Sequence, residues 1–223
     1  MNTPKRIYDL TQPIYHNCPG WPGQRLAVVD WEFQHVNDNF NAERVTFNTH
    51  TATHVDVPYH FLADGRTLDQ VPAETFAGPG VFFDLRKTVK PDSAITPEDL
   101  QSHMSRVEKG DIVILVTGYG KLYGFRDDYL HKYPYLGGPA AELLVKAGAK
   151  GVATDALSVG GFGGDEKARP CHLALLTNGV FILEGLTEIP EELFDGKKRY
   201  FTCFPMLING CGGAPARAVV HEF

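Results

Sequence analysis

The chain has 223 residues and a mass of 24.6 kDa, with 43% hydrophobic and 22% charged residues. These fractions are near globular averages, which excludes a disordered or fibrous protein, and a chain of this length can fold without disulfides or a structural metal. The net charge of −6 and the isoelectric point near 5.8 argue against nucleic-acid binding, which normally needs a basic face.

Membrane and export signals are absent from the sequence pattern. The longest apolar runs, such as Ile112–Val116, fall far short of the ~20 residues that a membrane span needs, and the N-terminus has no apolar core before a small-residue cleavage site. The four cysteines show neither a C-x-x-C pair nor a zinc-finger spacing, so we expect free thiols in a reducing compartment. The sequence therefore predicts a cytoplasmic protein with no membrane or nucleic-acid partner.

The predicted elements begin with strands and then alternate with helices. Thr96 and Pro97 are typical of a helix start, and the continuous apolar run at 111–117 is typical of a parallel strand covered on both faces. This order predicts a single α/β domain over residues 1–223, with a mixed sheet and a second, antiparallel sheet. In chain order we expect strands at 6–10, 26–36, 43–48 and 81–85, a helix at 96–107, a strand at 111–117, a helix at 138–146, strands at 151–154 and 180–184, a short helix after Pro190, and strands at 200–204 and 216–221.

The densest polar stretch, NTHTATHVDVPYHF, holds His50, His54, Asp56 and His60 within eleven residues. Imidazole and carboxylate are the ligands that zinc prefers and that manganese accepts. The interleaved β-branched residues and Pro58 disfavour a helix, so we expect an extended segment with His54 and Asp56 on one face. A lone histidine is more often structural than a ligand, but four metal-competent residues this close favour an open, catalytic type of metal site.

The segment HTATHVDVPYH resembles the signature H-x-G-T-H-x-D-x-P-x-H of the metal-dependent cyclase-like hydrolases, a family that includes bacterial kynurenine formamidases and isatin hydrolases. Ala52 stands where the family has glycine, and it would be strained if the backbone there needed a positive φ. Similar segments follow in the family's order: IYDLTQPIYHNCPGWPG near the start, TDALSVG at 154–160 and HLALLTNGVFILEGLTEI at 172–189. The resemblance implies the swivelling β/β/α fold, in which a central mixed sheet meets a smaller antiparallel sheet, and a homodimer or homotetramer.

The resemblance also implies metal ligands in two distant parts of the chain. Glu184 closes the apolar run VFILE, where a carboxylate is costly unless it is paired or bound to a metal; a solvated strand end is the alternative. By the resemblance, His50, His54 and Asp56 hold one ion, and in members with two ions Asp56 bridges to a second ion held by His172 and Glu184. The implied ligands are His50, His54, Asp56, His172 and Glu184.

By the same resemblance, His60 is the general acid and base. A histidine titrates near neutral pH, so beside a metal it can take a proton from water or give one to a departing amine. The alternative is that His60 is a fourth metal ligand.

Substrate contacts are expected from Trp21 and Cys18, in the N-terminal loop that helps form the pocket in the family, and from Phe40 as an aromatic wall. Ordinary loop packing is the alternative for each of them. The glycine-rich stretch at 160–164 lacks the pattern of a phosphate loop, and we interpret it as a mobile loop that could cover the site.

These observations predict a metal-dependent hydrolase that cleaves the C–N amide bond of a small substrate, an aryl formamide or a cyclic amide, with metal-activated water. The expected cofactor is Zn²⁺ or Mn²⁺, one or two ions per chain. Two alternatives stay open: a ring-forming cyclase or dehydratase that uses the same metal site, and a non-catalytic metal- or ligand-binding protein.

Overall fold

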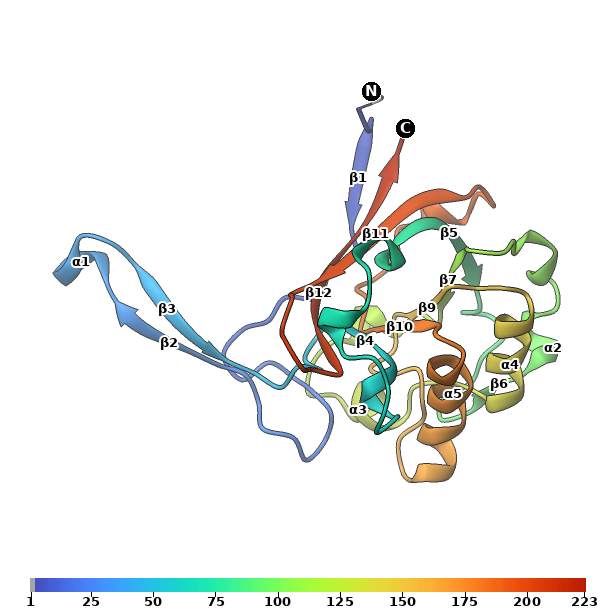
Figure 1. Ribbon diagram of the computed structural model, residues 1–223, viewed down its shortest axis with the longest axis horizontal. Helices are drawn as coiled ribbons and strands as arrows, with labels where there is room; N and C mark the ends of the chain where they lie inside the picture. The colour runs from blue at the N-terminus through green and yellow to red at the C-terminus, as the bar shows by residue number, and fades with distance from the viewer. Residues whose placement is uncertain (1–2) are drawn as a thin grey trace.

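The computed structural model describes residues 3–223 and is built around one eight-stranded mixed sheet (Figure 1). The strand order is β1-β12-β11-β5-β7-β9-β10-β4, and β4 also pairs with β12, so every strand except β1 belongs to a closed, barrel-like ring. Closure leaves these strands without a free edge. The strands are β1 (Arg6–Asp9), β4 (His54–Asp56), β5 (Ala77–Asp84), β7 (Ile112–Val116), β9 (Gly151–Thr154), β10 (Phe181–Glu184), β11 (Arg199–Pro205) and β12 (Gly213–Glu222).

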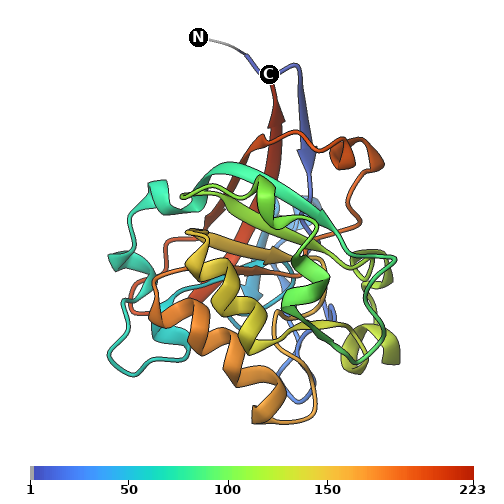
Figure 2. The same ribbon diagram turned by 90° about the vertical axis from the view of Figure 1, so that its right-hand side faces the viewer.

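The middle of the sheet is parallel because helices connect its strands. β5, β7, β9 and β10 run parallel, whereas β4, β11, β12 and β1 pair in antiparallel fashion. Helix α4 (Gly138–Lys146) connects β7 to β9, and α5 (Asp165–Thr177) connects β9 to β10. These two helices lie next to each other against one face of the sheet (Figure 2).

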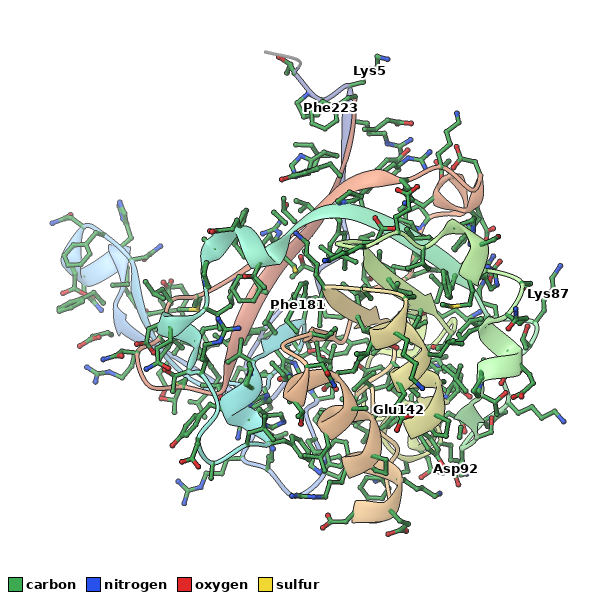
Figure 3. All side chains as sticks on the ribbon, turned by 45° about the vertical axis from the view of Figure 1, so that its right-hand side comes forward. Lys5, Lys87, Asp92, Glu142, Phe181 and Phe223 are labelled. Atoms are coloured by element: carbon green, nitrogen blue, oxygen red, sulfur yellow. The ribbon has the colours of Figure 1, made fainter. Side chains whose placement is uncertain are left out.

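Alternate residues of the central strands pack into two separate apolar cores. In β7, Ile112 and Ile114 belong to the core inside the ring, whereas Val113 and Leu115 belong to the core beneath the helices. Because both faces are covered, the whole strand is apolar, as predicted. Phe181 lies inside the molecule, while the labelled lysines extend from its surface (Figure 3).

The smaller elements lie at the periphery. β2 (Val28–Phe33) and β3 (Ala42–Thr46) form an antiparallel hairpin that projects far from the body and carries the single-turn helix α1 (His35–Asp38) at its tip (Figure 1). The remaining elements are β6 (Ala94–Ile95) and β8 (Tyr135–Leu136), which pair in parallel, and the short helices α2 (Pro97–Leu100) and α3 (Asp127–His131).

The structure confirms the mixed α/β architecture with a smaller antiparallel sheet, but several predicted elements had the wrong bounds. The strands expected at 81–85 and 216–221 begin earlier, at Ala77 and Gly213. The helix expected at 96–107 begins as predicted, with Thr96 and Asp99 forming a capping box, but it ends at Leu100. The serines and histidine that follow are weak helix formers, and the chain continues as turns. The strand expected at 26–36 ends at Phe33, where the chain turns into α1.

Two further sequence predictions can be compared with the structure. All four cysteines are free, as expected. Within residues 3–223, no helix has the length and apolar character required to cross a membrane.

Candidate metal centre

The predicted metal ligands meet on the face of β4 and β10 that is turned toward α5. These strands are antiparallel neighbours, and their register places Glu184 directly opposite His54. His54 and Asp56 share a face, as predicted from strand periodicity, while Val55 between them packs into the core inside the ring. His172, on α5, reaches the same face from above, so the two distant parts of the sequence converge at one place.

The ligand atoms lie close together and are almost completely buried. Asp56 has no exposed surface, and it lies within reach of all three histidines. The distances are 2.6 Å from His50 Nδ1 to Asp56 Oδ1, 3.4 Å from His54 Nε2 to both Asp56 Oδ1 and Glu184 Oε2, 3.4 Å from His172 Nε2 to Glu184 Oε1, and 3.9 Å from His172 Nε2 to Asp56 Oδ2.

Backbone hydrogen bonds orient the histidine rings toward this cluster. His54 Nδ1 donates to the Ala52 carbonyl at 2.9 Å, and His172 Nδ1 donates to the Ala168 carbonyl at 2.7 Å. Each bond leaves Nε2 as the nitrogen that faces the carboxylates, which is how proteins orient metal-binding histidines. Among the described residues, His54 Nε2 and Asp56 Oδ2 are buried without any hydrogen-bond partner, so the residues present fit a bound cation.

Two buried carboxylates make this site strongly favourable for positive charge. Burial opposes protonation of His54, but the charges of Asp56 and Glu184 raise its pKa to about 10. Burial and the charge of Asp56 act to raise the pKa of Glu184, yet His172 and His54, whose Nε2 atoms each lie 3.4 Å from this carboxylate, lower it to about 2. Protons on the histidines supply positive charge beside the two carboxylates. A divalent ion would displace those protons and supply the positive charge in their place.

His60 differs from the other histidines of the cluster. It ends the 3₁₀ turn Pro58–His60, and its ring stacks on that of His50 with 3.9 Å between centroids. Burial lowers the pKa of His60 to about 4, although Asp56 acts in the opposite direction. His60 is therefore neutral at pH 7 and able to accept a proton.

The possible ligand atoms form two groups that share Asp56. One group combines it with His54 and Glu184, and the other with His50 and His60, with the ligand atoms of each group within 4.8 Å of one another. This grouping differs from the one implied by the resemblance, which placed His54 with His50. It also leaves His60 close enough to be either a proton carrier or a ligand.

A pocket of about 260 Å³ opens above the cluster. Trp21, which we expect to contact substrate, lines it and packs against Phe162 with 5.7 Å between ring centroids. Phe61, which the sequence had not indicated, stacks on His172 at 4.3 Å and forms an aromatic wall beside the cluster. The pocket therefore presents flat apolar surfaces next to the metal-competent side chains.

The structure does not bring the other two expected substrate residues to this pocket. Cys18 is buried behind the N-terminal loop, with 1% of its surface exposed. Phe40 follows α1 near the tip of the hairpin, where it packs against Phe33 with 5.0 Å between ring centroids and is 52% exposed.

The first two glycines of the glycine-rich stretch, Gly160 and Gly161, are buried. A Cβ added at Gly160 would come within 3.0 Å of His172, and one added at Gly161 would come within 2.6 Å of Tyr135.

Sequence reasoning also missed a partner of Glu184 and most of the helix that carries His172. Ser158 Oγ and the Val159 N–H donate to Glu184 Oε1 at 2.8 and 2.7 Å and fix that carboxylate. The segment TDALSVG contains both residues, but nothing in its pattern indicates the contact. Pro170 lies inside α5, and because proline normally ends a helix, the sequence did not indicate a helix through this residue.

Ala52 adopts the backbone conformation that glycine favours. Its φ is +55°, in the left-handed region, and it is one of four such non-glycine residues in the part of the chain that the structure describes. Its carbonyl oxygen is the one that holds His54 Nδ1. The expected strain at the position where the family has glycine is therefore present, next to a metal-competent histidine.

The sequence is similar to a known family and to curated proteins over most of its length. The chain matches the family Cyclase ("Putative cyclase") over residues 8–160. It is 26% identical over 216 residues to a kynurenine formamidase of Bacillus cereus, with 96% of each chain covered, and 26% identical over 224 residues to that of Bacillus anthracis, with 99% of each covered.

Solved structures share the fold over nearly the whole chain. An isatin hydrolase bound to the product analogue thioisatinate superposes with a TM-score of 0.87 at 18% identity, covering 96% of this chain and 91% of that one. A structure described as a potential metal-dependent hydrolase with cyclase activity superposes with a TM-score of 0.75 at 26% identity, covering 98% of each chain.

Proposed function

Because this chain belongs to the Cyclase family, we propose that it is a metal-dependent hydrolase that cleaves the C–N amide bond of a small aryl formamide or cyclic amide. The observation that carries the proposal is the pair of buried atoms without hydrogen-bond partners, His54 Nε2 and Asp56 Oδ2, at the base of an aromatic-walled pocket. Each unsatisfied atom costs about 1–3 kcal/mol, and a cation bound between them would remove that cost.

His50, His54, Asp56, His172 and Glu184 would hold the ion or ions, and the sharing of Asp56 between two ligand groups supports two ions per chain. A bound divalent metal supplies a Lewis acid that lowers the pKa of water and polarises a carbonyl. We propose Zn²⁺ or Mn²⁺, because imidazole suits zinc and the two carboxylates also suit manganese.

His60 is proposed as the proton carrier. Its low pKa keeps it neutral at working pH, so it can take a proton from the attacking water and pass it to the departing nitrogen. Trp21 and Phe61 would hold a flat substrate between them, with the scissile amide over the cluster. The relatives named kynurenine formamidase and isatin hydrolase act on substrates of this flat, aromatic kind, which supports the choice.

The remaining features of the proposal come from the family resemblance. We propose a single catalytic domain over residues 1–223 with the swivelling β/β/α arrangement, a small-molecule substrate, a cytoplasmic location and a homodimer or homotetramer. The closed ring of strands and the projecting hairpin are compatible with these assignments.

The test is metal analysis of the purified protein beside turnover of N-formyl anilides and isatin-like lactams, with and without chelator. We expect stoichiometric zinc or manganese, loss of metal and turnover in His54→Ala, and retention of both in His35→Ala, which removes an exposed imidazole from α1 at the tip of the hairpin. A wild-type protein that binds no transition metal after reconstitution would make the cluster structural. Bound metal without turnover of any amide would favour a binding protein.

A ring-forming cyclase is the second candidate, because a structural relative is described as having cyclase activity. Ring closure of an amino acid to a lactam is the reverse of lactam opening and needs the same site. Incubation with the open-chain compound distinguishes the two: accumulation of the ring would indicate a cyclase.

A further inference from the structure

The glycine-rich stretch Gly160–Gly164 carries a single side chain, that of Phe162. Its first two glycines are fixed by their surroundings: a Cβ at Gly160 would lie 2.7 Å from a backbone oxygen of α5, and one at Gly161 would lie 2.6 Å from the ring of Tyr135. Its last two glycines have φ of +103° and +154°, a conformation that other residues rarely adopt, and they lead the chain into α5. The stretch therefore holds Phe162 at a defined place.

Phe162 lies between two other aromatic rings that belong to different parts of the chain. Its ring centroid is 5.7 Å from that of Trp21, in the N-terminal loop, and 4.6 Å from that of His131, at the end of α3. His131 is itself held by Asp127, one turn earlier, with 2.8 Å between Nδ1 and Oδ1. The three rings form a row that begins at α3 and ends at the wall of the pocket.

The two aromatic walls of the pocket are supported in different ways. Phe61 packs against the rings of His60 and His172, with centroid distances of 4.7 and 4.3 Å, so its place is set by the metal-competent cluster. Trp21 is only partly buried, and in the described part of the chain Phe162 supplies its one aromatic contact. The position of the Trp21 wall, and hence the width of the pocket, therefore depends on Phe162.

We infer that Phe162 determines substrate specificity by holding Trp21 at the distance from Phe61 that admits a flat ring and excludes a thicker one. A saturated ring is thicker than an aromatic one, because its carbons are puckered and carry hydrogens on both faces. The inference rests on the proposed function and narrows its substrate class to amides of planar aromatic amines. Phe162 stands behind Trp21 rather than in the pocket lining, so it acts as a positioning residue.

A second role for Phe162 has to be separated from this one. Its ring also packs against an apolar cluster that includes Tyr129, Tyr133 and Leu157. If that packing were its only role, loss of the ring would lower stability and leave the preference among substrates unchanged. The preference between a planar and a puckered substrate therefore distinguishes the two roles.

The test compares hydrolysis of N-formylaniline with that of N-formylcyclohexylamine, whose rings are planar and puckered respectively. In Phe162→Ala we expect KM for the planar substrate to rise about threefold to tenfold at unchanged kcat and bound metal, because the lost aromatic pair weakens binding and leaves the cluster intact. The ratio of kcat/KM for the planar over the puckered substrate should fall by at least as much. Intrinsic reactivity cancels, since the same two compounds are compared in every variant.

Two further variants serve as controls. Phe162→Tyr keeps the ring and should behave as wild type. Phe223→Ala also removes one ring of an aromatic pair, that with His221 at 6.3 Å, but this pair lies at the C-terminal end of the chain, so the preference between the two substrates should not change.

The fluorescence of Trp21 gives a reading that needs no turnover. The chain has two tryptophans, so Trp31→Phe leaves Trp21 as the reporter. In that background Phe162→Ala should increase quenching of Trp21 by acrylamide and shift its emission to longer wavelength, and Phe162→Tyr should do neither.

The outcomes separate this inference from the proposed function. Unchanged quenching of Trp21, or an unchanged preference between the two substrates, in Phe162→Ala would overturn the inference. A wild-type protein that hydrolyses neither formamides nor lactams would instead overturn the proposed function, and the quenching measurement would still show whether Phe162 positions Trp21.

Discussion

Replacing Ala52 with glycine should make the protein more stable, although glycine usually destabilises. Ala52 has a φ of +55°, and an alanine in the left-handed region costs about 1–2 kcal/mol. The greater freedom of glycine in the unfolded chain returns roughly 0.5–1 kcal/mol of this. The alanine methyl borders the pocket, so removing it opens no new cavity in the core. We therefore expect Ala52→Gly to raise the free energy of unfolding by about 0.5–1 kcal/mol.

The assay is urea unfolding with chelator present, so that metal binding does not contribute. The corresponding rise in melting temperature is about 1–4 °C for a chain of this size. Ala147→Gly is the matched control, because Ala147 ends α4 with a φ of −73° and should lose about 0.5–1 kcal/mol on the same change. A loss of stability in Ala52→Gly similar to that of the control would refute the assignment of strain to Ala52.

Three further predictions concern the cluster itself. Ser158→Ala removes a hydrogen bond of 2.8 Å to Glu184, so metal affinity should fall about 10–100-fold, as measured by chelator competition; unchanged affinity would contradict a supporting role for Ser158. His60→Asn should lower kcat about 10²–10⁴-fold at unchanged metal content, whereas a drop in bound metal would show that His60 is a ligand. In the metal-free protein, burial opposes protonation of His54, but the neighbouring carboxylates raise its pKa from 6.5 to about 10. The stabilisation of the fold by protonated His54 is therefore complete below pH 6.5 and is lost as the pH rises to about 10. Urea unfolding with chelator should therefore show wild type losing stability relative to His54→Gln between about pH 6.5 and about pH 10, and a pH-independent difference would speak against it.

The local pattern around His54 was sufficient to predict much of the site. β-branched residues and a proline indicated an extended segment, and the period of two then placed His54 and Asp56 on one face, as the structure shows. Helix α4 was predicted with its observed bounds, because Gly138-Pro139 and Gly148 are local signals for a start and an end. The helix from Thr96 was predicted correctly only at its start, since its end depends on weak preferences that no cap reinforces.

Other parts of the site depend on contacts between distant segments. His172 came from resemblance alone, and its helix was hidden by Pro170, whose ring packs near Gly138 of α4. Ser158 reaches Glu184 only because β9 and β10 are parallel neighbours, and Phe40 lies away from the pocket because it is near the tip of the projecting β2–β3 hairpin.

The sequence by itself determined that the segment from His50 to His60 holds metal-competent side chains and that the strand at 111–117 is buried on both faces, because each of these follows from neighbouring residues. Only the tertiary structure decided how the ligands are shared around Asp56, since the pairing of β4 with both β10 and β12 closes the ring and sets their positions. Only the tertiary structure also showed that the hairpin β2–β3 projects from the body and leaves Trp31 and Phe40 exposed. Long-range pairing sets these features, and no local preference along the chain encodes which distant strand becomes the neighbour.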